Sequence, residues 1–310
     1  MLTYTASRLA QAVAAVFAVI LVTFGLFKLT PGDPALNILG SRSSPEARAE
    51  LTRQLGLDDG VVTQFLQYSR KLIGGDFGES NKTGESVGHL LIDRAGPTIA
   101  LVIAGALVSV LAAAVLALIT TTRRDGRTDH AVRILTLIGL FLPTFWIGYV
   151  LIRVLAIPTG WFPVSGLSEG LTGYIRSLVL PAVTLALGLT PILLRSLRSS
   201  MIATLESEHV AAARSLGLSN ARVLRRHVMR NSVAPTISLL ATALGFLLFG
   251  VVVLETTFDI PGLGSALVTA AAQRDIPVLQ GVTVVFATAV VIINLLGDLG
   301  TALLDPRVRL

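Results

Sequence analysis

Long apolar runs constrain the fold of this chain more than any other feature. Each run has about 20 residues, the length that an α-helix needs to cross the hydrocarbon core of a bilayer. Only 14% of the 310 residues are charged, whereas soluble domains carry about 25%. We therefore predict an all-α integral membrane protein. Its six transmembrane helices are expected at residues 9–28, 97–121, 134–155, 177–194, 233–254 and 278–297.

The first apolar run could be taken for a signal peptide. It extends over residues 9–27, which is longer than the apolar core of a typical signal peptide, and the following "KLTPGDPA" offers no clear small-residue cleavage site. We expect this run to remain in the protein as a membrane anchor.

The distribution of arginine predicts the orientation of the spans. Arginines gather in "TRRDGRTDHAVR", in residues 195–230 and in the tail "DPRVRL", whereas the two loops after the third and fifth spans hold one arginine each. Cytoplasmic loops carry the excess of basic residues, so both termini are predicted inside. The predicted regions are a first transmembrane helix (1–28), an external segment (29–96) and a five-helix core (97–310) with a cytoplasmic loop at 195–235.

The external segment shows two helix signals. "SSPEARAELTRQLG" has Ser44 as a helix N-cap, Pro45 at the first helical position and Gly56 as a C-terminal stop. The following "DDGVVTQFLQYSRKLIGG" is typical of a second helix, whose apolar face we expect to contain Val62, Phe65, Leu66 and Leu72.

Several kinds of chemistry have no support in the sequence. The six spans contain no ionisable residue in their apolar cores; Arg153 lies at the end of the third and Asp298 just beyond the sixth. Proton-coupled carriers use such residues as relays. "DFGESNKT" lacks both glycines of a phosphate-binding loop, cysteine is absent and the histidines are scattered at 89, 130, 209 and 227. We expect no catalytic site, metal or cofactor in this chain. The net charge of +6 is attributed to arginines that flank the spans, and no nucleic-acid partner is expected.

The segment "EHVAAARSLGLSNARVLRRHVMRNSVAP" interrupts two apolar runs. Leu205, Ala212, Ala213 and Leu216 are predicted to share one helical face with His209. Gly217 is expected to end the helix in a left-handed conformation, and Ser219 to cap a second, basic helix that leads into the fifth span. The pattern suits a helix lying on lipid headgroups as well as a helix that docks onto another protein.

The same segment resembles the cytoplasmic signature of permeases of ABC importers. The signature has Glu-Ala-Ala followed by a glycine; here Ala211 replaces the glutamate, and this departure resembles the peptide-transporter branch. Further similarities, in the same order, are "TPGDPA", "GDFGES", "LLIDRAGPTIAL", "ETTFDIPGLG", "RDIPVLQG" and "ALLDPRVRL". Together they cover almost the whole chain and are most similar to the B-type permease subunit of dipeptide and oligopeptide importers.

The resemblance implies a type I ABC importer permease in a bacterial inner membrane. Its partners would be a second, homologous permease, two cytoplasmic ATPases and an external solute-binding protein, with membrane lipid around it. ATP and Mg²⁺ would bind to the ATPases and not to this chain. The substrate would be a dipeptide or oligopeptide; alternatives within the branch are nickel, glutathione, heme or another small solute. The residues alone leave two alternative functions open: a secondary carrier or channel, and a non-transporting scaffold or receptor.

The resemblance also assigns roles to residues. The ATPase-coupling helix would contain Leu205, His209, Ala211, Ala212, Ala213, Arg214, Leu216 and Gly217, supported by Ser219, Arg222, Arg226, His227 and Arg230. A possible outer gate or receptor contact comprises Glu255, Asp259, Pro261, Gly262, Gly264, Arg274 and Asp275. Ordinary solvation of a loop is the favoured interpretation for the two acids Glu255 and Asp259.

Overall fold

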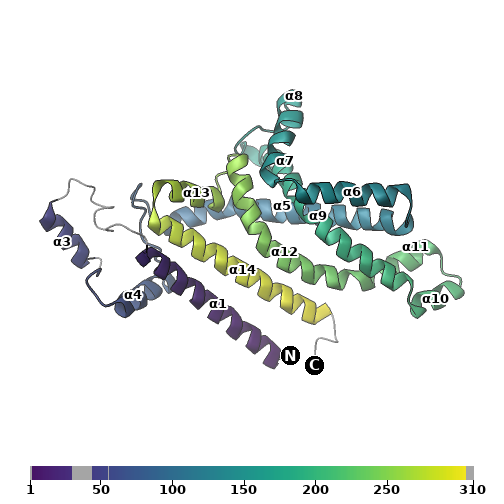
Figure 1. Cartoon of the computed structure of the whole chain (residues 1–310), viewed down its shortest axis with the longest axis horizontal. Coiled ribbons are helices and arrows are strands. Elements are labelled where there is room, and N and C mark those ends of the chain that lie inside the picture. Colours follow the sequence, from purple (N-terminus) through teal and green to yellow (C-terminus); the bar gives the residue numbers. More distant parts are fainter. Residues whose placement is uncertain (1, 30–43, 55, 305–310) are drawn as a thin grey trace.

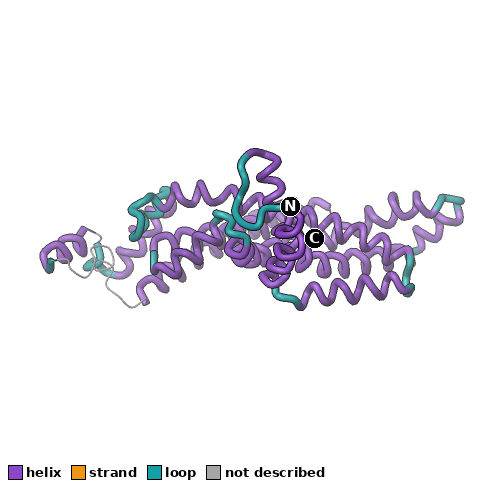
Figure 2. The backbone as a smooth tube through the Cα atoms, turned by 90° about the horizontal axis from the view of Figure 1, so that it is seen from above, coloured by secondary structure: helices purple, strands orange, loops and turns teal. Residues whose placement is uncertain are grey.

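The computed structural model describes residues 2–29, 44–54 and 56–304. The motif "TPGDPA" and the "DPRVRL" tail lie outside this range. Within it the backbone is mostly helical (Figure 2), with a single isolated antiparallel bridge between Glu79 and Ser86. The elements are α1 (Leu2–Leu29), α3 (Pro45–Gln54), α4 (Val61–Ile73), α5 (Val87–Thr122), α6 (Arg127–Phe141), α7 (Thr144–Leu151), η1 (Ile152–Ala156), α8 (Ile157–Thr159), α9 (Gly170–Leu205), α10 (Glu208–Ser215), α11 (Asn220–Val223), η2 (Leu224–Met229), α12 (Arg230–Thr257), α13 (Leu263–Gln273) and α14 (Ile276–Leu304).

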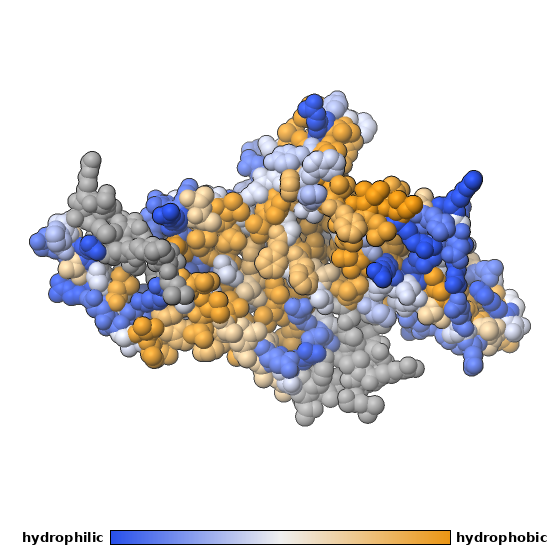
Figure 3. All heavy atoms as spheres, viewed as in Figure 1, coloured by the Kyte–Doolittle hydropathy of each residue, from blue (hydrophilic) through white to orange (hydrophobic). Residues whose placement is uncertain are grey.

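Five of these helices, α1, α5, α9, α12 and α14, are long and apolar enough to cross a membrane. They correspond to the predicted first, second, fourth, fifth and sixth spans. The surface between the two ends of the molecule is largely hydrophobic, and hydrophilic residues gather toward the ends (Figure 3). The turn between α5 and α6 lies at the same end as α10 and α11, whereas α3, α4 and α13 lie at the other (Figure 1). This arrangement separates the predicted cytoplasmic loops from α3, α4 and α13, whereas α8, before the predicted external loop of the third span, projects from the middle of the molecule (Figure 1).

The third span differs from the prediction of one helix at 134–155. It is divided into α6 and a second helical stretch from α7 to α8, and the two parts are bent by 106°. The break falls where Leu142 adopts an extended conformation, with φ −77° and ψ 136°, directly before Pro143. The proline ring disfavours the helical conformation of the preceding residue, so α6 ends there.

The centre of the bundle is α9, which packs mainly against α5 and α12. Buried residues on α5 recur every fourth position and are mostly small: Leu101, Gly105, Ser109, Ala113 and Ala117. Small residues at this spacing allow two membrane helices to approach closely. A Cβ atom on Gly105 would overlap the side chain of Leu185 on α9, so this glycine sets the distance between the two helices.

The two helices of the predicted external segment form where the sequence predicts them. The Ala47 N–H donates to Ser44 Oγ over 3.2 Å, and Gly56 has a φ of +64°, as a cap and a stop require. The predicted apolar face of α4 is partly wrong, since Val62 and Leu66 are exposed. The face toward α1 contains Phe65, whose ring centroid lies 5.7 Å and 5.5 Å from those of Phe17 and Phe24, together with Tyr68. Leu72 is half-buried.

Candidate functional site

The helix α10, which is predicted to be cytoplasmic, ends as the sequence predicts. Gly217 has a φ of +77°, a left-handed conformation that glycine adopts without steric cost. Its N–H donates to the Arg214 carbonyl over 2.9 Å, and the Leu218 N–H donates to the Ala213 carbonyl over 3.3 Å. These two hydrogen bonds define a Schellman motif. The motif turns the chain sharply and separates α10 from α11.

The predicted common face of the cytoplasmic helix is wrong in two residues. Leu205 ends α9, and the break at Ser207 starts a new helix whose rotation is independent of α9. Ala213 faces inward with Val210, and both are buried in the main hydrophobic core. The exposed residues include His209, Ala211, Ala212, Arg214 and Leu216, which lie around the rest of the helix surface. Leu216 is 83% exposed, which leaves a leucine and two alanines open to a partner.

The residues after the turn form a continuous helical path into the membrane. Ser219 occupies the N-cap position of α11, but its side chain makes no capping hydrogen bond, contrary to the prediction. The path continues through the π-helical η2 into α12 without a break. Arg222, Arg226 and Arg230 are exposed, and none forms an ion pair with any residue that the structure describes; His227 is half-buried. These arginines remain available to lipid or protein.

A buried ion-pair cluster that the sequence analysis missed links α6 to α9. Asp129 is fully buried and accepts hydrogen bonds from Arg133 Nη2 at 2.6 Å, Arg198 Nη2 at 2.7 Å and the Asp125 N–H at 3.1 Å. The spacing of Asp129 and Arg133 along one helix was a visible signal. Arg198 is distant in sequence, and nothing in the sequence indicated its part in the cluster.

At the outer end, Glu255 contradicts the prediction of a solvated loop residue. Its exposure is 0%. Thr98 Oγ1 of α5 donates to Glu255 Oε1 over 2.6 Å, and the Ser265 N–H of α13 donates to Glu255 Oε2 over 2.9 Å. The Leu263 N–H also donates to Thr98 Oγ1 over 2.8 Å. One carboxyl group therefore connects α12, α5 and α13.

The glycines of "PGLG" allow this connection. A Cβ atom on Gly262 would overlap the Glu255 carboxyl group, and one on Gly264 would lie 2.5 Å from Val252 Cα of α12. Both positions require the absence of a side chain because α13 lies so close to α12. Glycine was predicted here as part of a gate, and the close approach is the physical reason for it.

The remaining outer residues divide into a buried and an exposed group. Asp275 is buried; Ser80 Oγ donates to its Oδ2 and the Asn81 N–H to its Oδ1 over 3.2 Å. Asp259, Pro261 and Arg274 are exposed. Asp275 thus holds the loop before α5 against the turn between α13 and α14, whereas the exposed group remains available for contact with another protein.

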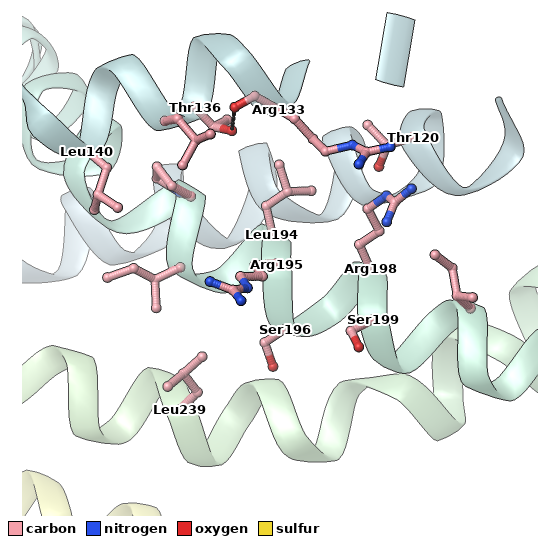
Figure 4. A pocket seen from close by; sticks show the side chains of 14 residues that line it. Thr120, Arg133, Thr136, Leu140, Leu194, Arg195, Ser196, Arg198, Ser199 and Leu239 are labelled. Atoms are coloured by element: carbon pink, nitrogen blue, oxygen red, sulfur yellow. Dashed lines mark hydrogen bonds between the residues drawn. The ribbon is translucent and has the colours of Figure 1, made fainter. Parts of the chain in front are cut away.

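One large groove opens on the predicted cytoplasmic half of the bundle (Figure 4). Its volume is about 870 Å³, and α6 and α9 supply most of its walls. The lining residues are Thr120, Arg133, Thr136, Leu137, Leu140, Pro191, Ile192, Leu194, Arg195, Ser196, Arg198, Ser199, Ile202 and Leu239.

One group of possible metal ligands occurs among the described residues, although the sequence predicted none. His89 Nδ1 lies 3.4 Å from Glu85 Oε1 and 3.2 Å from Asp93 Oδ2. All three side chains are exposed. Neighbours spaced four residues apart on a helix surface commonly pair in this way, so the grouping does not by itself indicate a metal site.

The fold is similar to that of solved importer permeases. A chain of the MetNI methionine ABC transporter in an inward-facing conformation superposes with a TM-score of 0.57 at 15% identity, over 70% of this chain and 96% of that chain. A second crystal form of the same transporter gives a TM-score of 0.59 at 16% identity, with the same coverage. At these identities the likeness concerns the fold alone.

Sequence relatives match over nearly the full length. The chain is 34% identical to the probable peptide ABC transporter permease protein y4tP of Sinorhizobium fredii over 99% of both chains. It is 34% identical to the di/tripeptide transport system permease protein DppB of Pseudomonas aeruginosa over 100% of this chain and 99% of that one. Residues 1–102 match the family model for the N-terminal part of binding-protein-dependent transport system membrane components, and residues 109–310 match the model for the inner membrane component. The chain therefore belongs to the inner-membrane permeases of binding-protein-dependent ABC transport systems.

Proposed function

We propose that this permease imports dipeptides or short oligopeptides, as one half of a heterodimeric translocation unit driven by two ATPase subunits. The chain itself is non-catalytic in this proposal: ATP and Mg²⁺ bind to the ATPases, and an external binding protein delivers the peptide. The peptide substrate is supported by the names of full-length relatives at about one-third identity. Nickel, glutathione, heme or another small solute is the alternative cargo within the same branch.

The proposed coupling of this chain to an ATPase is supported by the residues of α10 that are exposed. Ala212 and Leu216 are exposed at the predicted cytoplasmic end, and the neighbouring Ala213 is buried in the core and anchors the helix there. Small alanine side chains permit close approach to the helix backbone, and the exposed Leu216 adds apolar surface that a partner can bury. Burial of such a leucine contributes about 1.5–3 kcal/mol.

A matched pair of substitutions tests this role. Ala212→Glu places a charge on the exposed face of α10, whereas Ala221→Glu places the same charge on an exposed position of α11. The complete transporter is reconstituted in proteoliposomes with the external binding protein, and ATP-dependent, vanadate-sensitive uptake of a radiolabelled dipeptide is measured. We expect uptake to be lost in Ala212→Glu and retained in Ala221→Glu, with normal membrane insertion of both.

Two results would contradict the proposal. Equal uptake by the two variants would remove α10 as the coupling element. Uptake driven by a proton gradient without ATP would identify a secondary carrier instead. Competition of unlabelled dipeptides, glutathione and nickel with the labelled peptide then separates the candidate substrates.

A further inference from the structure

The groove between α6 and α9 changes in polarity along its length. Its basic end contains Arg133 and Arg198, at the side of the cytoplasmic loops. Its apolar end contains Leu140 of α6 and Pro191 of α9. These residues lie seven positions from Arg133 and Arg198, which corresponds to roughly 10 Å along each helix. The groove is therefore cationic at the membrane surface and apolar toward the membrane interior.

The positive charge of the groove is only partly neutralised by the protein. Arg133 and Arg198 share the buried carboxylate of Asp129, and Arg133 also reaches Asp125 Oδ1 at 3.5 Å. Arg195 forms no ion pair with any residue in the described part of the chain. Its side chain extends from α9 into the space between α9 and α12, where Leu239 lies (Figure 4). Arg195 is exposed, so its charge is open to an anionic ligand from outside the protein.

We propose that this groove binds one anionic phospholipid of the cytoplasmic leaflet, with its phosphate at Arg195 and an acyl chain along the leucine-lined end. The order of polarity matches that of a phospholipid: anionic headgroup at the interface and hydrocarbon below it. Basic pockets between membrane helices on the cytoplasmic side are typical sites for such headgroups. A volume of about 870 Å³ is far more than a free phosphate ion fills, and ligand sites of 300–1,000 Å³ accommodate molecules of substantial size.

The site lies beside the cluster of Asp129, Arg133 and Arg198, which joins α6 to α9. A bound phosphate near Arg195 adds a negative charge to the same group of cations and fills the gap between the two helices. The lipid would therefore strengthen the contact between α6 and α9. This role is separate from coupling through α10 and from the choice of substrate.

The test is a lipid titration of the delipidated transporter complex, read by native mass spectrometry. Phosphatidylglycerol and phosphatidylcholine are the two probes, because they differ in headgroup charge. We expect phosphatidylglycerol to bind about fivefold more tightly, since one basic residue near a membrane surface contributes about that factor. The preference should fall to about one in Arg195→Gln. It should remain in Arg225→Gln, which removes the same charge at an exposed position outside the groove.

A second variant separates a groove from simple surface attraction. Leu140→Trp adds bulk at the apolar end and keeps every arginine. We expect it to weaken phosphatidylglycerol binding by a factor of several, because the acyl chain loses its place. Unchanged binding in Leu140→Trp, or an unchanged preference in Arg195→Gln, would overturn the proposal.

Two other occupants would also overturn it. Displacement of the lipid by millimolar dipeptide would identify the groove as a substrate site. A cross-link from Ile192→Cys to the second permease, with no lipid bound in the assembled complex, would identify it as a subunit interface. None of these measurements depends on transport, so their failure leaves the proposed function untouched.

Discussion

Glu255 gives the sharpest prediction for the outer end of the molecule. Glu255→Ala removes the acceptor of the Ser265 N–H and the partner of Thr98. Thr98 Oγ1 keeps an alternative acceptor, the Arg94 carbonyl at 3.3 Å, so the Ser265 N–H is the group left unpaired. A buried unpaired donor costs about 1–3 kcal/mol, and the cavity left by the lost side chain adds about 2 kcal/mol. The expected local destabilisation is about 3–5 kcal/mol.

Hydrogen exchange of the α13 amides measures this loss directly. A cost of about 3 kcal/mol or more corresponds to exchange that is faster by a factor of about 100 or more. Glu255→Gln provides the control, because its amide oxygen still accepts from Ser265 while its NH₂ group donates to Thr98. Its cost is about 1 kcal/mol, or roughly fivefold in exchange.

Two outcomes would refute this reasoning. Exchange in Glu255→Ala within about threefold of the wild-type rate would show that the carboxyl group does not hold α13. A glutamine variant as damaged as the alanine variant would show that negative charge, rather than hydrogen bonding and shape, is what the site requires. Dipeptide uptake by the same variants then shows whether the connection matters for transport.

Three further predictions concern packing and ion pairs. Asp129→Ala should lower the stability of the detergent-solubilised protein by about 1–3 kcal/mol, because the partly exposed guanidinium groups of Arg133 and Arg198 lose a shared buried partner; Asp125→Asn, at an exposed position whose left-handed backbone suits asparagine, should cost less than about 1 kcal/mol, and thermal unfolding distinguishes the two. Asp275→Asn should speed exchange of the loop that it binds by about tenfold or more, whereas Asp259→Asn should leave that loop unchanged. Gly105→Leu should cost about 1–3 kcal/mol by separating α5 from α9, and an unaltered unfolding temperature would contradict that packing.

The spans were predictable because bilayer thickness fixes the length of an apolar helix. The exception is the third span, which is broken at Pro143. Pro143 ends α6, yet Pro181 and Pro191 lie inside the continuous helix α9. α9 is enclosed between α5 and α12, and neighbouring helices can compensate for the hydrogen bonds that a proline removes. Whether a proline breaks a membrane helix thus depends on packing, which the sequence does not reveal.

In the candidate sites, features that depend on residues nearby in the sequence were predictable, whereas features that depend on distant residues were not. The stop at Gly217 follows from nearby residues and was predicted correctly. The burial of Ala213 depends on contact with the core, and that of Glu255 depends on Thr98, which lies 157 positions away. From sequence alone, a charged residue that follows an apolar run is interpreted as part of a solvated loop. Its distant hydrogen-bond partners become known only from the structure. The helical periodicity also gave a wrong prediction across Ser207. The helix is broken there, so the residues before and after the break do not share one face.

The unbroken path from α11 through η2 into α12 has a mechanical consequence. Measured along its axis, the path covers roughly 55 Å at 1.5 Å per residue, from the turn after α10 to Glu255, and α12 bends on the way (Figure 1). The outer half of α12 is roughly 20 Å long, and a tilt of about 5° displaces its end by about 2 Å. The hydrogen bonds around Glu255 lie within 3 Å and cannot stretch by that amount. Any such tilt must therefore either carry α13 and the start of α5 along with it or disengage them, so that a small movement beneath the membrane becomes an all-or-none event on its far side.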